Sequence, residues 1–77
     1  MTTREQVLEI LKEVKPTKNL ENIQDIVEGG YIDSFELMLL ITTLSERFGV
    51  EIDIEDIVPE NFNSADAIAR MVDSLKA

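Results

Sequence analysis

The longest amphipathic pattern in the chain predicts a central helix. Between Ser34 and Phe48, apolar residues recur at steps of four, three and four, which places their side chains on one side of an α-helix. Asp33 and Glu36 have the spacing of a capping box at the start, and Gly49 stands where helices commonly end. We therefore expect a helix from Ser34 to Phe48. Its side chains toward the core are Leu37, Leu40, Ile41, Leu44 and Phe48.

A shorter amphipathic helix is predicted at the beginning of the chain. Thr3 and Gln6 are spaced as a capping box. Pro16 disfavours helical geometry in the residue before it, so we expect this helix to end near Val14 or Lys15. Its apolar side consists of Val7, Leu8, Leu11 and Val14.

The last helix is predicted to begin near Asn63 or Ser64. Asp66 lies in its first turn, where a negative charge is favourable, and Phe62 lies just outside as a hydrophobic staple. Apolar residues then recur with the spacing of one helix face. These residues are Ile68, Met71, Val72 and Leu75.

The connection from Pro16 to Asp33 is long and rich in apolar residues. It carries Leu20, Ile23, Ile26, Val27 and Ile32. These residues predict a loop that lies across the core, with a helical turn at Glu21 to Val27, rather than a flexible linker. Gly29 and Gly30 allow the chain to turn sharply before the central helix.

The segment from Val50 to Ile57 alternates apolar and acidic residues, as a half-buried strand does. No second segment offers a partner strand, and an isolated strand would leave its backbone groups unpaired. We therefore expect an extended turn with Ile52 in the core and a short helix from Ile54 to Val58, closed by Pro59. The predicted fold class is all-α: one domain, residues 1–77, forming a four-helix bundle of three main helices and one short helix with a long first loop.

The composition argues against several classes of function. The 77 residues contain no cysteine and no histidine, which removes disulfides, thiolate metal sites and the usual catalytic base. We therefore expect neither an autonomous enzyme nor a metal site. Sixteen acidic against seven basic residues give a net charge of −9. This charge disfavours binding to nucleic acids and anionic membranes and favours docking to basic protein surfaces.

The chain also lacks the signals of membrane insertion and secretion. No apolar run approaches the roughly 20 residues of a membrane span, and the first residues lead into an amphipathic helix rather than a signal peptide. We therefore expect a cytoplasmic protein. We also expect a monomer.

The acidic residues after Gly49 invite comparison with a calcium loop. Counting from Asp53, however, Val58 occupies the position that needs glycine, and Ser64 occupies the position that needs a bidentate glutamate. The calcium-loop hypothesis therefore fails. The simpler interpretation is a solvated acidic edge that also attracts basic partners. This edge consists of Glu51, Asp53, Glu55 and Asp56.

Ser34 is the candidate functional residue. As the first residue of the central helix, it places a hydroxyl near unpaired backbone N–H groups and the positive end of the helix dipole, a favourable position for an attached phosphate. An Asp-Ser pair before an apolar run is also an ordinary helix start. This motif alone therefore leaves both interpretations open.

The full pattern resembles the acyl and peptidyl carrier protein family over essentially the whole chain. The resemblance is carried by Gly30–Phe35, Leu37, Leu40, Ile41, Leu44, Phe48, Gly49–Ile52, Phe62–Ser64, Ile68 and Val72. It implies that Ser34 receives 4′-phosphopantetheine from coenzyme A, transferred by a separate phosphopantetheinyl transferase with magnesium. It also implies that Asp33 caps the helix and helps to position the magnesium ion during this modification.

The resemblance further implies a function as a covalent carrier. A partner ligase would load an acyl or aminoacyl group as a thioester on the thiol of the arm. A downstream acyltransferase or synthase would then receive that group. An alternative of a different class is an unmodified acidic helical adaptor that binds a protein partner through the central helix.

The residue after the serine bears on the cargo. Carriers of the fatty-acid type commonly have leucine at this position, where the present chain has Phe35. The motif Ile32–Phe35 is more similar to D-alanyl carrier proteins and to other carriers that serve adenylating ligases. Both acyl and aminoacyl cargo, including D-alanine, therefore stay open.

One flank of the central helix is predicted to contact partners. With about 100° of rotation per residue, the core side leaves several apolar side chains on a neighbouring flank, and an exposed apolar patch beside Ser34 is typical of a binding surface. Alternatively, Met38 and Leu39 pack under the long loop. Leu39 also stands where the fatty-acid type usually has an acidic residue. The predicted partner surface consists of Phe35, Glu36, Met38, Leu39, Thr42 and Glu46.

Overall fold

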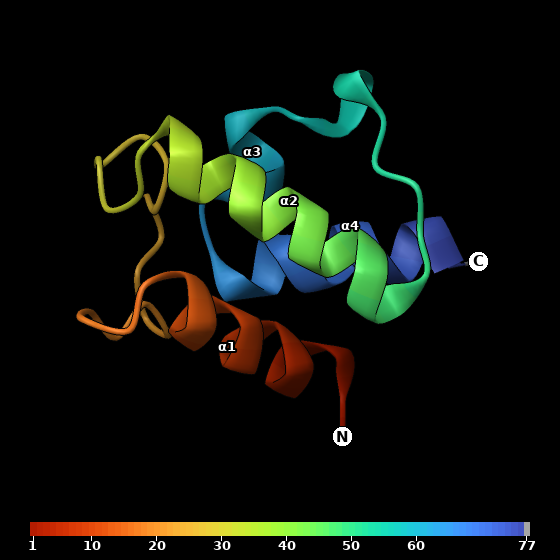
Figure 1. Ribbon diagram of the computed structural model, residues 1–77, viewed down its shortest axis with the longest axis horizontal. Helices are drawn as coiled ribbons and strands as arrows, with labels where there is room; N and C mark the ends of the chain where they lie inside the picture. The colour runs from red at the N-terminus through yellow and green to blue at the C-terminus, as the bar shows by residue number, and fades with distance from the viewer. Residues whose placement is uncertain (77) are drawn as a thin grey trace.

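The computed structural model describes residues 1–76, which contain three long helices and two short ones. In chain order they are α1 (Thr3–Val14), α2 (Ser34–Phe48), the 3₁₀-helix η1 (Ile54–Asp56), α3 (Pro59–Phe62) and α4 (Ala65–Lys76). The helix α1 packs against α2 and α4, and α3 packs against α4. In Figure 1, α2 passes in front of α4, and α1 lies along their lower side. The described residues form no strand, and the predicted all-α four-helix bundle is confirmed.

The core is formed by the three long helices, Phe62 of α3 and the loop between α1 and α2. Within α2, Leu40, Ile41 and Leu44 are buried, whereas Leu37 and Phe48 are partly exposed and pack against the core from its edge. The loop contributes three side chains that are at most 6% exposed, namely Leu20, Ile26 and Ile32. The loop therefore lies across the core, as predicted.

The helical turn predicted at Glu21 to Val27 is wrong. The backbone N–H of Ile26 donates to the carbonyl oxygen of Asn63 at 2.9 Å, and that of Val27 donates to the Asn63 side chain at 3.0 Å. In a helix, these N–H groups would bond to carbonyl oxygens four residues earlier in the loop. The contact with the junction between α3 and α4 replaces the helix.

The start of α1 lies one residue earlier than predicted. Thr2, not Thr3, is the N-cap, and its hydroxyl accepts from the Glu5 N–H at 3.1 Å while the Glu5 carboxylate accepts from the Thr2 N–H at 2.8 Å. The capping box predicted for Thr3 and Gln6 is therefore wrong. The Thr3 hydroxyl instead donates to the Asp73 carboxylate at 2.7 Å and links α1 to α4.

The buried side of α1 is rotated relative to the predicted apolar side. Ile10 is fully buried, although the predicted apolar side did not include it, and Leu8 is only partly buried. The four buried residues follow the spacing of one helix face, at i, i+3, i+4 and i+7. Through this packing α1 contacts both α2 and α4.

Pro59 opens a helix instead of closing one. The predicted helix from Ile54 to Val58 is reduced to the single turn η1, and Pro59 is the first residue of α3. Proline suits this position because its missing N–H would have no partner there, and it holds Val58 in an extended conformation. Ile52 packs against the core, as predicted.

The last helix agrees with the prediction at its start. The Ser64 hydroxyl accepts from the Ala67 N–H at 3.0 Å, and Phe62, just before it, is buried. The predicted stripe is buried at Ile68, Met71 and Val72, with Leu75 packing at its edge. None of the helices within residues 1–76 has the length and apolar character needed to cross a membrane.

Candidate functional site

Ser34 is the first residue of α2, and it is exposed. The predicted capping box beside it is confirmed. The Glu36 N–H donates to the Asp33 carboxylate at 2.8 Å, and the Asp33 N–H donates to the Glu36 carboxylate at 3.0 Å. Because these two neighbours supply the whole box, the start of α2 does not depend on the Ser34 hydroxyl.

Glu36 has a second partner, on α1. Its two carboxylate oxygens lie 3.3 and 3.2 Å from the Lys15 ammonium, and both side chains are less than one-third exposed. Glu36 therefore turns toward α1. The structure separates it from the other predicted partner residues, because its carboxylate is engaged inside the molecule.

The remaining five predicted partner residues share the solvent face of α2. With about 100° of rotation per residue, each of the five side chains lies within about 60° of their mean direction around the helix axis. The buried Leu44 lies on the opposite side of the helix. Phe35 is 76% exposed, Met38 58% and Leu39 43%. The alternative in which Met38 and Leu39 pack under the loop is therefore wrong. The five exposed residues, called here the α2 solvent face, are Phe35, Met38, Leu39, Thr42 and Glu46.

Two adjoining hollows lie beside Ser34, and they share Val27 and Leu37 as walls. One has a volume of about 280 Å³ and is lined by Val27, Ile32, Asp33, Ser34 and Leu37. The other has a volume of about 150 Å³ and is lined by Val27, Leu37, Ile57, Val58, Pro59 and Phe62. Ser34 thus stands at the rim of a largely apolar depression. Sequence reasoning missed Val27 as a site residue, because only the tertiary fold brings this loop residue to the start of α2.

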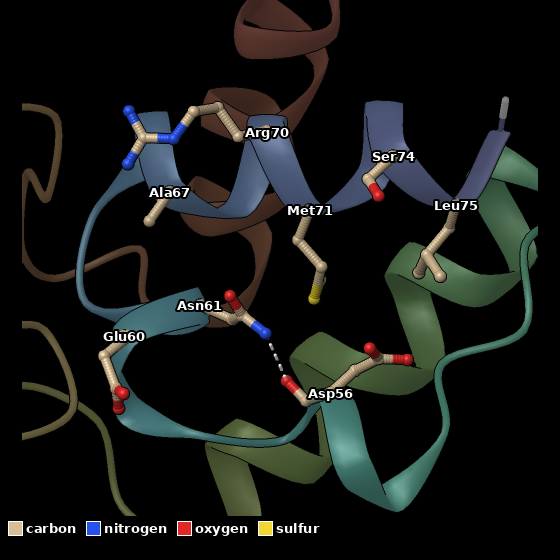
Figure 2. Close-up of a pocket in the computed structure, with 8 residues that line it drawn as sticks. All are labelled: Asp56, Glu60, Asn61, Ala67, Arg70, Met71, Ser74 and Leu75. Carbon is tan, nitrogen blue, oxygen red and sulfur yellow. Dashed lines mark hydrogen bonds between the residues drawn. The ribbon is translucent and has the colours of Figure 1, made fainter.

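A further cavity of about 250 Å³ lies away from Ser34, between α4 and the segment that contains η1 and α3. Figure 2 shows Met71 and Leu75 pointing into it from α4, with Asn61 on the other side donating to the Asp56 carbonyl oxygen at 2.8 Å. No residue of α2 lines this cavity. It is therefore separate from the candidate site.

The acidic edge is a surface feature. Glu51, Asp53 and Glu55 are exposed, and Asp56 is partly exposed. Within residues 1–76, no three histidine, cysteine, aspartate or glutamate side chains come together as metal ligands would. The edge therefore adds negative charge to the surface.

Residues 4–72 match the phosphopantetheine attachment site family. The match covers most of the chain, and the chain belongs to this family. It is a carrier protein that holds acyl or aminoacyl groups on 4′-phosphopantetheine. The resemblance recognised from the sequence is therefore confirmed at the level of the family.

The chain is also similar to curated D-alanyl carrier proteins. Those of Staphylococcus saprophyticus and Enterococcus faecalis are each 28% identical to it over 78 residues, covering 99% of this chain and 100% of theirs. That of Bacillus cereus is 27% identical over 75 residues, covering 95% of each chain. Within the carrier family, the chain is therefore closer to the D-alanyl type, as its motif indicated.

Proposed function

We propose that Ser34 is the residue that carries phosphopantetheine. The observation that supports this most strongly is an exposed hydroxyl at the first position of α2 that the helix cap does not use. Ser64 provides the contrast, because it also stands at a helix start but is only 6% exposed and caps α4 through its side chain. The Ser34 hydroxyl is therefore accessible for the attachment of an arm.

The residues around Ser34 suit a phosphate ester. The cap occupies the N–H groups of Glu36 and Leu37, which leaves the N–H groups of Ser34 and Phe35 as donors at the positive end of the helix dipole. The exposed Asp33 carboxylate keeps one oxygen outside the box, available to help position magnesium during modification. When attached, the arm supplies a terminal thiol on which a cargo is held as a thioester.

The chain itself acts as a carrier and does not catalyse loading or transfer. Its lack of cysteine and histidine supports this division of work, because the nucleophile then comes from the arm and the catalytic groups from the partners. The partners are a phosphopantetheinyl transferase, an activating ligase and a downstream acyltransferase or synthase. The proposed functional unit is the single domain 1–77, acting as a monomer in the cytoplasm.

For the cargo, we infer an aminoacyl group, with D-alanine as the first candidate. The support comes from the similarity to D-alanyl carrier proteins together with Phe35 after the serine. Leu39 on the α2 solvent face, 43% exposed, favours a partner with an apolar contact at that point. The proposed docking surface is the α2 solvent face. Glu36 is not part of it, because its carboxylate is bound to Lys15.

The attachment site is tested by intact mass. The protein is incubated with coenzyme A, magnesium and a phosphopantetheinyl transferase, and the parent should gain the mass of one arm. Ser34→Ala should fold normally, because Asp33 and Glu36 keep the cap, and should gain no mass. Ser74→Ala, at an exposed serine of α4, is the matched control and should be modified like the parent. Modification of Ser34→Ala would refute the assignment.

The cargo is tested on the modified protein. It is incubated with ATP and either the ligase that serves one of the related D-alanyl carriers, with D-alanine or L-alanine, or an acyl ligase, with a medium-chain fatty acid. We expect the mass of a thioester-bound residue with D-alanine and much less with the other two. Loading by an acyl ligase with fatty acid alone would contradict the aminoacyl proposal and leave the Ser34 assignment intact.

A further inference from the structure

Asn63, at the junction between α3 and α4, is bonded to the loop that leads to Ser34. Its side-chain oxygen accepts from the N–H groups of Val27 at 3.0 Å and Glu28 at 3.1 Å. Its side-chain amide donates to the Glu28 carboxylate at 2.7 Å. Its backbone oxygen accepts from the Ile26 N–H at 2.9 Å. One residue thus holds three successive loop residues that are 35 to 37 positions away in the chain.

The segment held in this way is a compact turn. Within it, the Gly30 N–H donates to the Val27 carbonyl oxygen at 3.1 Å, and the Tyr31 N–H donates to the Ile26 carbonyl oxygen at 3.0 Å. Gly30 has a φ of 76°, a conformation that favours glycine. The chain then passes through the buried Ile32 to the cap of α2. The turn is therefore closed by its own backbone hydrogen bonds.

The turn forms the wall of the site. Val27 lines both hollows beside Ser34, and the Val27 N–H is one of the groups that Asn63 holds. The Ser34 hydroxyl, in contrast, is positioned by α2 and its own cap. Loss of the Asn63 side chain should therefore allow Val27 to leave its position beside the hollows, while Ser34 keeps its position.

We propose that Asn63 is a positioning residue for the modification of Ser34, acting by holding the Val27–Glu28 turn in the form that the phosphopantetheinyl transferase contacts. This inference rests on the proposed attachment at Ser34. An enzyme that reaches the Ser34 hydroxyl must cover the adjoining wall. If only a fraction of the molecules keeps the wall in place, the apparent affinity falls by that fraction. The effect belongs in KM, because the serine in each bound molecule is unchanged.

The test compares Asn63→Ala with Asn61→Ala in the unmodified protein. Asn61 is the matched control, since its side chain bonds to the Asp56 carbonyl oxygen and not to the turn (Figure 2). For Asn63→Ala we expect KM for the carrier to rise on the order of tenfold at nearly constant kcat. Asn61→Ala should keep the parent KM. Equal KM values in the two variants, or a loss confined to kcat, would overturn the proposal.

A rescue separates this role from general stability. Asn63→Asp keeps the oxygen that accepts from Val27 and Glu28, but sets a carboxylate against that of Glu28, so KM should rise. Adding Glu28→Gln places an amide donor opposite the carboxylate introduced at position 63. The hydrogen bond can then form again with donor and acceptor exchanged, and KM should return toward the parent value. Amide hydrogen exchange at Val27 and Glu28 should follow the same order. Failure of the second change to lower KM would contradict the positioning role.

The two proposals fail in different ways. If the parent gains no arm, attachment at Ser34 is refuted. If the parent is modified at Ser34 and Asn63→Ala is modified with the same KM, the attachment site stands and the role of Asn63 is refuted.

Discussion

The Lys15 ammonium lies 3.2 Å from the Glu36 carboxylate and so joins the C-cap residue of α1 to the first turn of α2. The same carboxylate accepts the Asp33 N–H. One side chain therefore fixes both the start of α2 and its distance from α1. Ser34 lies between the cap residues Asp33 and Glu36, so the ion pair helps to fix the position of Ser34.

This pair should show measurable coupling. In a cycle of Lys15→Met and Glu36→Gln, the glutamine still accepts from the Asp33 N–H, so only the ion pair is lost. We expect a coupling of about 0.5–1 kcal/mol in the free energy of unfolding, weaker at high salt, because both side chains are less than one-third exposed. The more exposed pair of Arg47 and Glu13 should couple less. If urea unfolding showed no coupling between the two changes, a stabilising role of the ion pair between Lys15 and Glu36 would be refuted.

The core should respond to truncation according to burial. Leu44 is fully buried, so Leu44→Ala should lower the free energy of unfolding by about 2–5 kcal/mol. Phe48→Ala should cost less, because Phe48 packs at the edge of the core. Leu39→Ala, on the α2 solvent face, is the control for removing the same side chain. Urea unfolding that ranks Leu39→Ala with Leu44→Ala would contradict the orientation of α2.

Charge on the α2 solvent face should affect loading more than folding. Met38→Glu and Leu39→Glu place a carboxylate in a contact that would be desolvated in the complex, at a cost to binding. We expect a small change in melting temperature and a raised KM for the carrier in loading by its ligase. Ser74→Glu adds the same charge on α4 and should load normally. Normal loading of both α2 variants would exclude this face as the docking surface.

The cap of α1 should make stability depend on pH. The Thr2 backbone N–H, followed by the Thr2 side chain, lowers the pKa of the Glu5 carboxyl below its ordinary value of 4.5. Because the folded pKa is the lower one, the stabilisation is complete above the unfolded pKa and disappears as the pH falls through the folded pKa. The stability difference between the parent and Glu5→Gln should therefore shrink below pH 4.5. A difference that stays constant with pH would contradict the shift.

The sequence alone was sufficient for features that local physics controls. The bounds of α2, its Asp33–Glu36 cap and the helix start at Ser64 depend on residues within one turn of each other, so their spacing predicts them. The exposure of Phe35 follows from the same periodicity. The carrier family could be recognised because its motif lies within this locally determined region.

Only the tertiary structure decided which of several local options was used. Thr2 and Thr3 each have a possible capping-box partner three residues later in the sequence. In the structure Thr2 is the N-cap, and the Thr3 hydroxyl bonds to Asp73 instead. The position of Glu36 on the helix suited a partner surface, but in the folded chain its carboxylate is bound to Lys15.

The loop before α2 shows the same limit most clearly. Its apolar residues predicted burial, but its backbone donors bond to Asn63, which is far away in the chain. The position of the wall beside Ser34 is therefore set by a contact between segments that meet only in the folded chain. Local spacing carries no record of such a contact, because its free energy depends on which donors and acceptors the packed core brings together.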